Sequence, residues 1–231
     1  MKEESWSKEG VERASFRAVL RNDVKEEQAG QGFILCQGEM EWAKEEGWLL
    51  TASLFQYGRF LFLYTEGVGK RIVPEELFPS MSSYLELWPP MIEEGGQDRL
   101  WIPMQPYYYH AQPKHVRHWT EGRNPQLRRG RIALLAPGKW EEYLEYHLAL
   151  VKEGLIEGDR YHLISIHENV LFSYFEEPKT MVNLQNRPGA HSNVLEDWLR
   201  TEPESHFLRF VPGQGPGPDA NFVFMPCRAG I

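Results

Sequence analysis

The spacing of apolar residues along the second half of the chain alternates between two periods. Short runs that are apolar or alternate with polar residues, bounded by Gly, Pro or Asn, predict strands. Residues 139–154 instead repeat their large apolar side chains about every 3.6 positions, which predicts a helix. Asn193, three residues before Glu196, predicts the cap of a second helix. The predicted order is strand 131–136, helix 139–154, strands 161–167 and 170–176, a helix from 193, and strand 221–225.

The first half predicts the same βαββαβ order. Its predicted elements are strand 15–20, a longer helix ending near Gly47, strands 49–57 and 59–66, a helix 75–88 stopped by Pro89-Pro90, and strand 105–110. This order is typical of a ferredoxin-like unit, which carries its helices on one face of the sheet. We therefore predict an α+β fold in which two such repeats pack sheet to sheet as an α+β barrel. This packing would bury Phe62, Tyr64, Phe172 and Tyr174.

An internal repeat supports this division. At an offset of 110 positions, eight residues between 61 and 88 meet an identical residue. The pairs are Leu61/Leu171, Phe62/Phe172, Tyr64/Tyr174, Glu66/Glu176, Ser82/Ser192, Leu85/Leu195, Glu86/Glu196 and Trp88/Trp198. We predict an N-terminal repeat over 14–114, a C-terminal repeat over 128–231, and a junction near 115–129.

Composition narrows the classes of function. A hydrophobic fraction of 42% with 8 Trp, 10 Tyr and 12 Phe is ample for a buried core. The net charge of -8 argues against nucleic acid as a partner, because such proteins concentrate Lys and Arg on one face. The two cysteines are too few for a disulfide framework, and the charged opening segment does not fit a signal peptide. No apolar run approaches the roughly 20 residues that span a bilayer, so we predict a cytoplasmic protein without a membrane partner.

The second half resembles a known family. The runs APGKWEEYLEYHLALVKEGL, YHLISIHENVLFSYFE, NVLEDWLR and NFVFM, within residues 131–226, are similar to the L-rhamnose mutarotase family. The resemblance implies a dimeric α+β barrel that interconverts the anomers of a monosaccharide without metal or cofactor. It predicts that this chain is a sugar mutarotase, an aldose 1-epimerase-type isomerase acting on a rhamnose-like sugar.

The resemblance also implies the site residues. His147 would be the general acid, and Tyr143, four residues earlier on the helix, would bind the sugar. Tyr161 and Trp198 match further sugar-binding positions, and Asp197 stands where the family has a second tryptophan. The general base stays open among Glu145, Asp197 and His167.

The first half lacks this site. At the same offset Phe33 stands for Tyr143 and Gln37 for His147, while a shifted register gives Gln28 and Gly32. Neither register supplies an acid. We therefore predict a structural first half, filled or apolar around Phe33, beside a second half with a cavity at His147. The chain would act as a monomeric pseudo-dimer or as a homodimer.

Other interpretations remain open. Tyr143 and His147 fit an amphipathic helix that simply packs on the sheet. His115 and His118 have the spacing of metal ligands, but without acidic or Cys neighbours a linker is the better interpretation. For function, the alternatives are a non-catalytic sugar-binding or structural barrel, and a cofactor-free monooxygenase or haem-handling barrel, which also carries a histidine in an apolar pocket.

Overall fold

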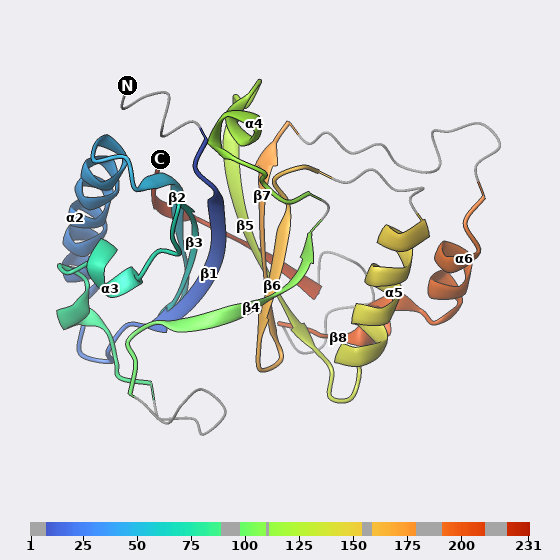
Figure 1. Cartoon of the computed structure of the whole chain (residues 1–231). Coiled ribbons are helices and arrows are strands. Elements are labelled where there is room, and N and C mark those ends of the chain that lie inside the picture. The colour runs from blue at the N-terminus through green and yellow to red at the C-terminus, as the bar shows by residue number, and fades with distance from the viewer. Residues whose placement is uncertain (1–7, 89–97, 110, 154–158, 179–190, 211–220) are drawn as a thin grey trace. The chain divides into compact units, whose positions relative to one another are not determined.

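The computed structural model describes residues 8–88, 98–109, 111–153, 159–178, 191–210 and 221–231. The chain forms two compact units (Figure 1). Unit 1 comprises Met1–Met104, Pro113–Asn124 and Pro226–Ile231, and unit 2 comprises Gln105–Gln112 and Pro125–Met225. The segments 105–112 and 226–231, which close the two predicted repeats, thus each belong to the other unit.

Unit 1 is an antiparallel sheet in the order β10-β2-β3-β1-β4. Its elements are β1 (Val11–Val19), α2 (Glu26–Glu45), β2 (Leu49–Tyr57), β3 (Phe60–Val68), α3 (Pro74–Leu77), the 3₁₀ turn η1 (Ser82–Tyr84), the first residues of β4 (Ile102–Tyr109), α4 (Val116–Thr120) and β10 (Cys227–Gly230). Strand β1 lies between β3 and β4, as expected for a split βαβ unit. Helix α2 packs Phe33, Cys36 and Met40 into the core of this unit.

Unit 2 repeats the plan in the order β4-β6-β7-β5-β8, with β9 also pairing with β5. Its further elements are β5 (Leu127–Leu135), α5 (Trp140–Glu153), β6 (Leu163–His167), β7 (Val170–Glu177), α6 (Asn193–Arg200), the 3₁₀ turn η4 (Pro203–His206), β8 (Phe207–Leu208) and β9 (Phe222–Met225). The α+β class is therefore confirmed. None of the described helices is long and apolar enough to cross a membrane.

Two predictions about helices were wrong. Instead of one helix over 75–88, the chain forms only the four residues of α3 and the three of η1. Pro79 explains the interruption, because a proline disfavours helical geometry at the preceding residue, here Phe78 at φ -125° and ψ 61°. The cap of α6 is Ser192 rather than Asn193, and the Ser192 side chain accepts a hydrogen bond from the Leu195 N–H at 2.9 Å.

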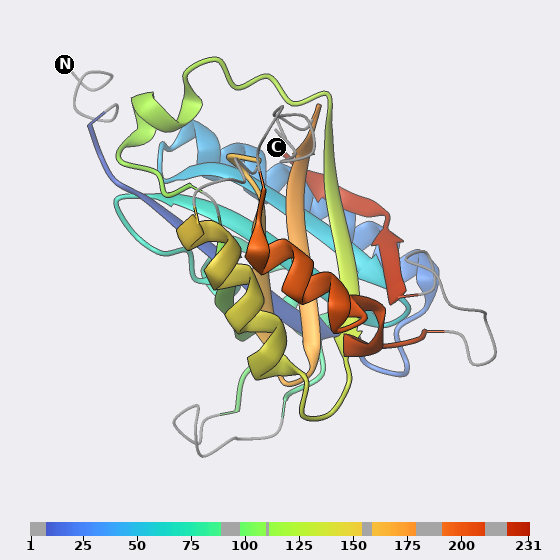
Figure 2. The ribbon, with the colours of Figure 1, turned by 90° about the vertical axis from the view of Figure 1, so that its right-hand side faces the viewer.

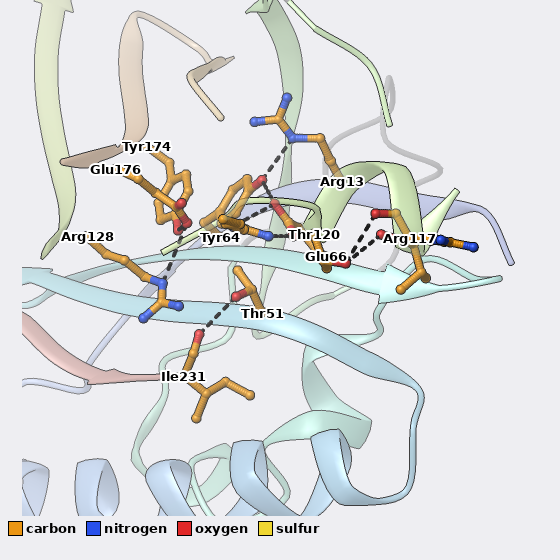
Figure 3. Close-up of polar contacts among 12 residues, drawn as sticks. Arg13, Thr51, Tyr64, Glu66, Arg117, Thr120, Arg128, Tyr174, Glu176 and Ile231 are labelled. Carbon is orange, nitrogen blue, oxygen red and sulfur yellow. Dashed lines mark hydrogen bonds and ion pairs between the residues drawn. The ribbon is translucent and has the colours of Figure 1, made fainter. Parts of the chain in front are cut away.

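The third strand of each unit carries the same buried pair of polar residues. Phe62, Tyr64, Phe172 and Tyr174 are buried, as predicted. The Tyr64 hydroxyl donates to Glu66 at 2.5 Å, and the Tyr174 hydroxyl donates to Glu176 at 2.7 Å (Figure 3). Each glutamate lies directly across from an arginine of its neighbouring strand, Glu66 from Arg13 and Glu176 from Arg128. The sequence repeat thus corresponds to a repeated cross-strand motif.

The carboxylate of Glu66 in unit 1 binds an arginine with both of its oxygens. Arg123 binds Glu66 with two nitrogens, at 2.7 and 3.2 Å, and the Arg13 Nε donates to the Tyr64 hydroxyl at 2.8 Å. Burial by itself would raise the pKa of Glu66, but the charges of Arg123 and Arg13 outweigh this effect and hold the pKa of Glu66 below its usual value. In unit 2, Arg128 stands 3.7 Å from Glu176 and is partly exposed.

We expect Glu66→Gln to lower the free energy of unfolding by about 3 to 5 kcal/mol, because it leaves the Arg123 guanidinium buried without its counter-charge. Since folding lowers the Glu66 pKa, the stabilisation is present above the unfolded pKa and is lost as pH falls through the folded value. Urea unfolding between pH 7 and pH 3 measures both effects. Glu176→Gln is the matched control and should cost less; an equal loss for both variants would contradict the assignment.

Candidate functional site

Helix α5 carries the two central residues of the predicted site. It lies over the sheet of unit 2 with α6 alongside, as both views of the ribbon show (Figure 2). Tyr143 and His147, one turn apart, face that sheet and are 5% and 9% exposed. The His147 Nδ1 lies 2.9 Å from the Tyr143 carbonyl oxygen. Because a carbonyl only accepts, Nδ1 donates in this contact, and Nε2 is the nitrogen that can accept a proton in the neutral ring.

Aromatic rings surround the His147 imidazole. Its centroid lies 4.2 Å from the Tyr143 ring and 5.1 Å from each of Tyr108 and Trp198. Burial raises the pKa of both tyrosines above their usual range, so both stay neutral phenols. The structure thus brings together three of the predicted site residues, Tyr143, His147 and Trp198.

The surroundings of the other predicted residues differ from one another. Asp197 is exposed on α6 and its carboxylate pairs with Arg200 at 2.9 Å. Tyr161 precedes β6, where its N–H donates to Asp159. On β6 itself Ile164 and Ile166 pack with Tyr143, so His167 points to the opposite face by the alternation of the strand. Glu145 is exposed on α5.

Arg131 is a residue of this site that the sequence reasoning missed. It shares the face of β5 with Ala133 and Leu135, and its guanidinium lies 4.4 Å from the Phe222 ring centroid and 5.9 Å from that of Phe175. Within the part of the chain that the structure describes, no carboxylate pairs with it, and its buried Nε has no hydrogen-bond acceptor. Burial lowers its pKa. The signal was available, since Arg131 opens the apolar run RIALLA on its helix-facing side.

Trp198 and His206 add further polar groups. The buried Trp198 Nε1–H has no acceptor among the described residues. His206 is fully buried next to Tyr143, and its Nε2 lies 3.3 Å from a Glu142 carboxylate oxygen. A hydrogen bond from Lys139 holds the pKa of Glu142 below its usual value. Among the described residues, no cluster of three His, Cys, Asp or Glu side chains could hold a metal ion; His115 accepts the His118 N–H and so caps α4.

The corresponding place in unit 1 differs from the prediction. The region around Phe33 is not filled: a cleft of about 670 Å³ opens there. Gln37, which stands for His147, holds the C-terminal strand instead, since its side chain accepts the Gly230 N–H at 2.8 Å and donates to the Gly230 carbonyl at 3.3 Å. The prediction that the place around Phe33 is filled or apolar was therefore wrong, because three arginines line this cleft.

Arg131 makes a prediction about stability. Replacing Arg131 with Met removes a guanidinium that is buried without a counter-charge, which is stabilising. The same replacement loses the cation–π contacts with Phe222 and Phe175, which together contribute about 1 to 2 kcal/mol. We expect Arg131→Met to leave the free energy of unfolding unchanged or to raise it by about 1 to 2 kcal/mol. Chemical denaturation measures the change, with the exposed Arg209→Met as control. A clear loss of stability in Arg131→Met alone would show that a partner within the protein neutralises Arg131.

Comparisons with known proteins give no family. No family model matches the chain, and no curated protein matches it. Among solved structures, a putative monooxygenase from Lactobacillus acidophilus has 6% identity and a TM-score of 0.44, with 96% of each chain covered. A putative monooxygenase from Fusobacterium nucleatum has 8% identity and a TM-score of 0.39 over 96% of this chain and 94% of that one. A mutant chlorite dismutase from Candidatus Nitrospira defluvii has 10% identity and a TM-score of 0.35 over 98% and 95%. Likeness at this level does not assign a function.

These findings correct the prediction of a sugar mutarotase. The matching structures named above are putative monooxygenases and a chlorite dismutase, and not sugar isomerases. The site agrees with the correction, because Asp197 and the proposed bases Glu145 and His167 do not face the His147 ring. The rings of Tyr108, Tyr143 and Trp198 lie around the His147 imidazole.

Proposed function

We propose that unit 2 binds a planar aromatic acid or phenol beside His147 and removes a proton from it, as the first step of an oxygenation by dioxygen that uses no bound cofactor. The observation that carries the proposal is the combination in one unit of the His147 ring, held by its Nδ1 contact, with the buried and unneutralised Arg131. A cation without a carboxylate partner favours an anionic ligand, because burial of an isolated charge is costly.

Different residues of unit 2 would contact different parts of such a ligand. The rings of Tyr108 and Trp198 offer faces and edges against which a flat molecule can stack. Arg131 and the Trp198 indole N–H offer donors to an oxygen that carries negative charge. Tyr143 lies next to both His147 and Arg131, so its hydroxyl is placed to hold the same oxygen.

His147 Nε2 takes a proton from a phenol O–H or from an acidic C–H of the ligand, and the electron pair of that bond stays on the ligand as a phenolate or an enolate. Dioxygen forms a bond to the carbon that shares this negative charge, and the peroxide oxygen takes the proton back from His147. The hydrogen that this carbon still carries then leaves with the outer peroxide oxygen as water, and the carbon becomes a carbonyl, so that one oxygen atom enters the product and the other leaves as water.

The Tyr143 ring centroid lies 4.2 Å from that of His147 and 5.8 Å from that of Tyr107. The proposed reaction assigns no step to haem.

The predicted packing of the two sheets as an α+β barrel, and with it a monomeric pseudo-dimer, belongs to the same proposal. Its support is the burial of Phe62 and Tyr64 in unit 1 and of Phe172 and Tyr174 in unit 2, on alternate positions of their strands.

Oxygen uptake tests the proposed reaction. The protein is offered a panel of polyhydroxylated aromatic compounds and aryl ketones with acidic C–H bonds, and the product is identified by mass. We expect His147→Gln to lower kcat for the active compound by about 10²-fold or more, because the base is lost. Arg131→Met should raise KM, and Arg131→Lys, which keeps the positive charge, should raise KM less.

His191→Gln, which changes an exposed histidine, is the control and should leave uptake unchanged. If compounds of the panel bind without oxygen uptake, the proposed enzymatic function is wrong and the protein is a ligand-binding protein. Uptake that His147→Gln leaves unchanged would overturn the role of His147.

A further inference from the structure

The cleft of about 670 Å³ in unit 1 is lined by three arginines from three separate segments of that unit. Arg21 follows β1, Arg59 lies at the turn between β2 and β3, and Arg228 lies on β10. Apolar side chains, among them Leu20 and Phe33, form part of the same lining. Glu26 is the acidic residue among those that line the cleft.

The same backbone framework occurs in unit 2. The Leu20 N–H donates to the Arg59 carbonyl at 2.8 Å, and the Leu135 N–H donates to the Asn169 carbonyl at 2.8 Å. The side chains repeat the contact in reverse, from Arg59 Nε to the Leu20 carbonyl at 2.8 Å and from Asn169 Nδ2 to the Leu135 carbonyl at 3.4 Å. Arg59 and Asn169 are thus equivalent positions, again 110 residues apart.

Arg228 also has a counterpart in unit 2. Strands β10 and β4 each contain a bulge, at Arg228 and at Tyr107 respectively. The Arg228 guanidinium lies 5.9 Å from the Phe33 ring centroid, and the Tyr107 ring lies 5.8 Å from that of Tyr143, the residue equivalent to Phe33. In unit 2 the Tyr107 hydroxyl donates to the Trp140 carbonyl at 2.7 Å and binds the edge strand to α5. Unit 1 has arginines where unit 2 has neutral side chains.

The arginines are oriented by the fold of unit 1. Arg21 Nη1 donates to the Ser83 carbonyl at 2.6 Å, and Arg228 Nε donates to the Gln56 side chain at 2.8 Å. Asp23 neutralises Arg21 and Glu86 neutralises Arg59. Arg228 has no carboxylate partner within the described ranges, and its Nε contact leaves both terminal nitrogens for a ligand. This geometry suits the two oxygens of a carboxylate or phosphate.

We infer that this cleft is a binding site for a small organic anion, whose carboxylate or phosphate pairs with Arg228 and whose flat apolar part lies against Phe33. It is separate from the His147 site and does not depend on the function proposed for that site. The ligand class follows from the two chemistries that meet in the cleft, a cation with free donors and an aromatic ring.

Titrations of the isotope-labelled protein with benzoate, phenyl phosphate and inorganic phosphate test the inference. We expect benzoate or phenyl phosphate to shift the backbone amide signals of Gly30 and Gly58, which line the cleft, with a dissociation constant in the millimolar range or tighter. Comparison of these two probes tells whether the site takes a carboxylate or a phosphate. Inorganic phosphate should bind more weakly than phenyl phosphate, because it lacks the apolar part.

Arg228→Gln should weaken binding at least about tenfold, and Arg228→Lys should weaken it less. The matched control, Arg209→Gln, removes an exposed arginine of unit 2 and should leave the titration unchanged. Three results would overturn the inference: no shift at Gly30 and Gly58 with either aromatic probe, equal affinity in Arg228→Gln, or inorganic phosphate binding as tightly as phenyl phosphate. His147→Gln should not affect this titration, whatever its effect on oxygen uptake.

Discussion

The buried carboxylate of Glu66 is the constraint on which the packing of unit 1 depends. A carboxylate without solvent exposure is stable only if charged donors surround it, because isolated burial costs several kcal/mol. Arg123 supplies two of those donors, and it belongs to the segment Pro113–Asn124, which follows β4 in the chain. Trp119 of the same segment lies against the Arg13 guanidinium at 5.1 Å. The charge on β3 thereby explains why this segment belongs to unit 1.

Comparison of the two units shows which features of the repeat are kept and which differ. The Tyr-x-Glu pair on the third strand and the arginine across from it occur in both units, and so does the bulge on the edge strand. The second half of the repeated sequence diverged in structure: Ser82 begins a 3₁₀ turn, whereas Ser192 caps the helix α6. At the 110-residue offset, Pro89 and Pro90 stand where α6 has Leu199 and Arg200, and proline is unfavourable inside a helix.

Each unit contains an arginine for which the described residues supply no carboxylate partner. In unit 2 the charge is Arg131, held inside the unit by aromatic rings near His147. In unit 1 it is Arg228, an exposed residue that lines the cleft. A buried charge without a partner reduces stability, so Arg131 is costly to the fold, and this favours its interpretation as a binding residue. The two units therefore share a scaffold and differ in what each can bind.

Local sequence determined most of the strands and the first helix of each unit. The run Leu49–Tyr57 and the pattern around Val170 predict β2 and β7 almost to the residue, because period and turn residues act over a few positions. The packing of Tyr143 and His147 under α5 also follows from helical spacing. The tertiary structure decided the rest: the charge of Arg131 without a partner, the pairing of Arg123 with Glu66, and the exchange of the segments 105–112 and 226–231 between units. These features join residues far apart in the chain, and a period or a local motif carries no information about such distant partners.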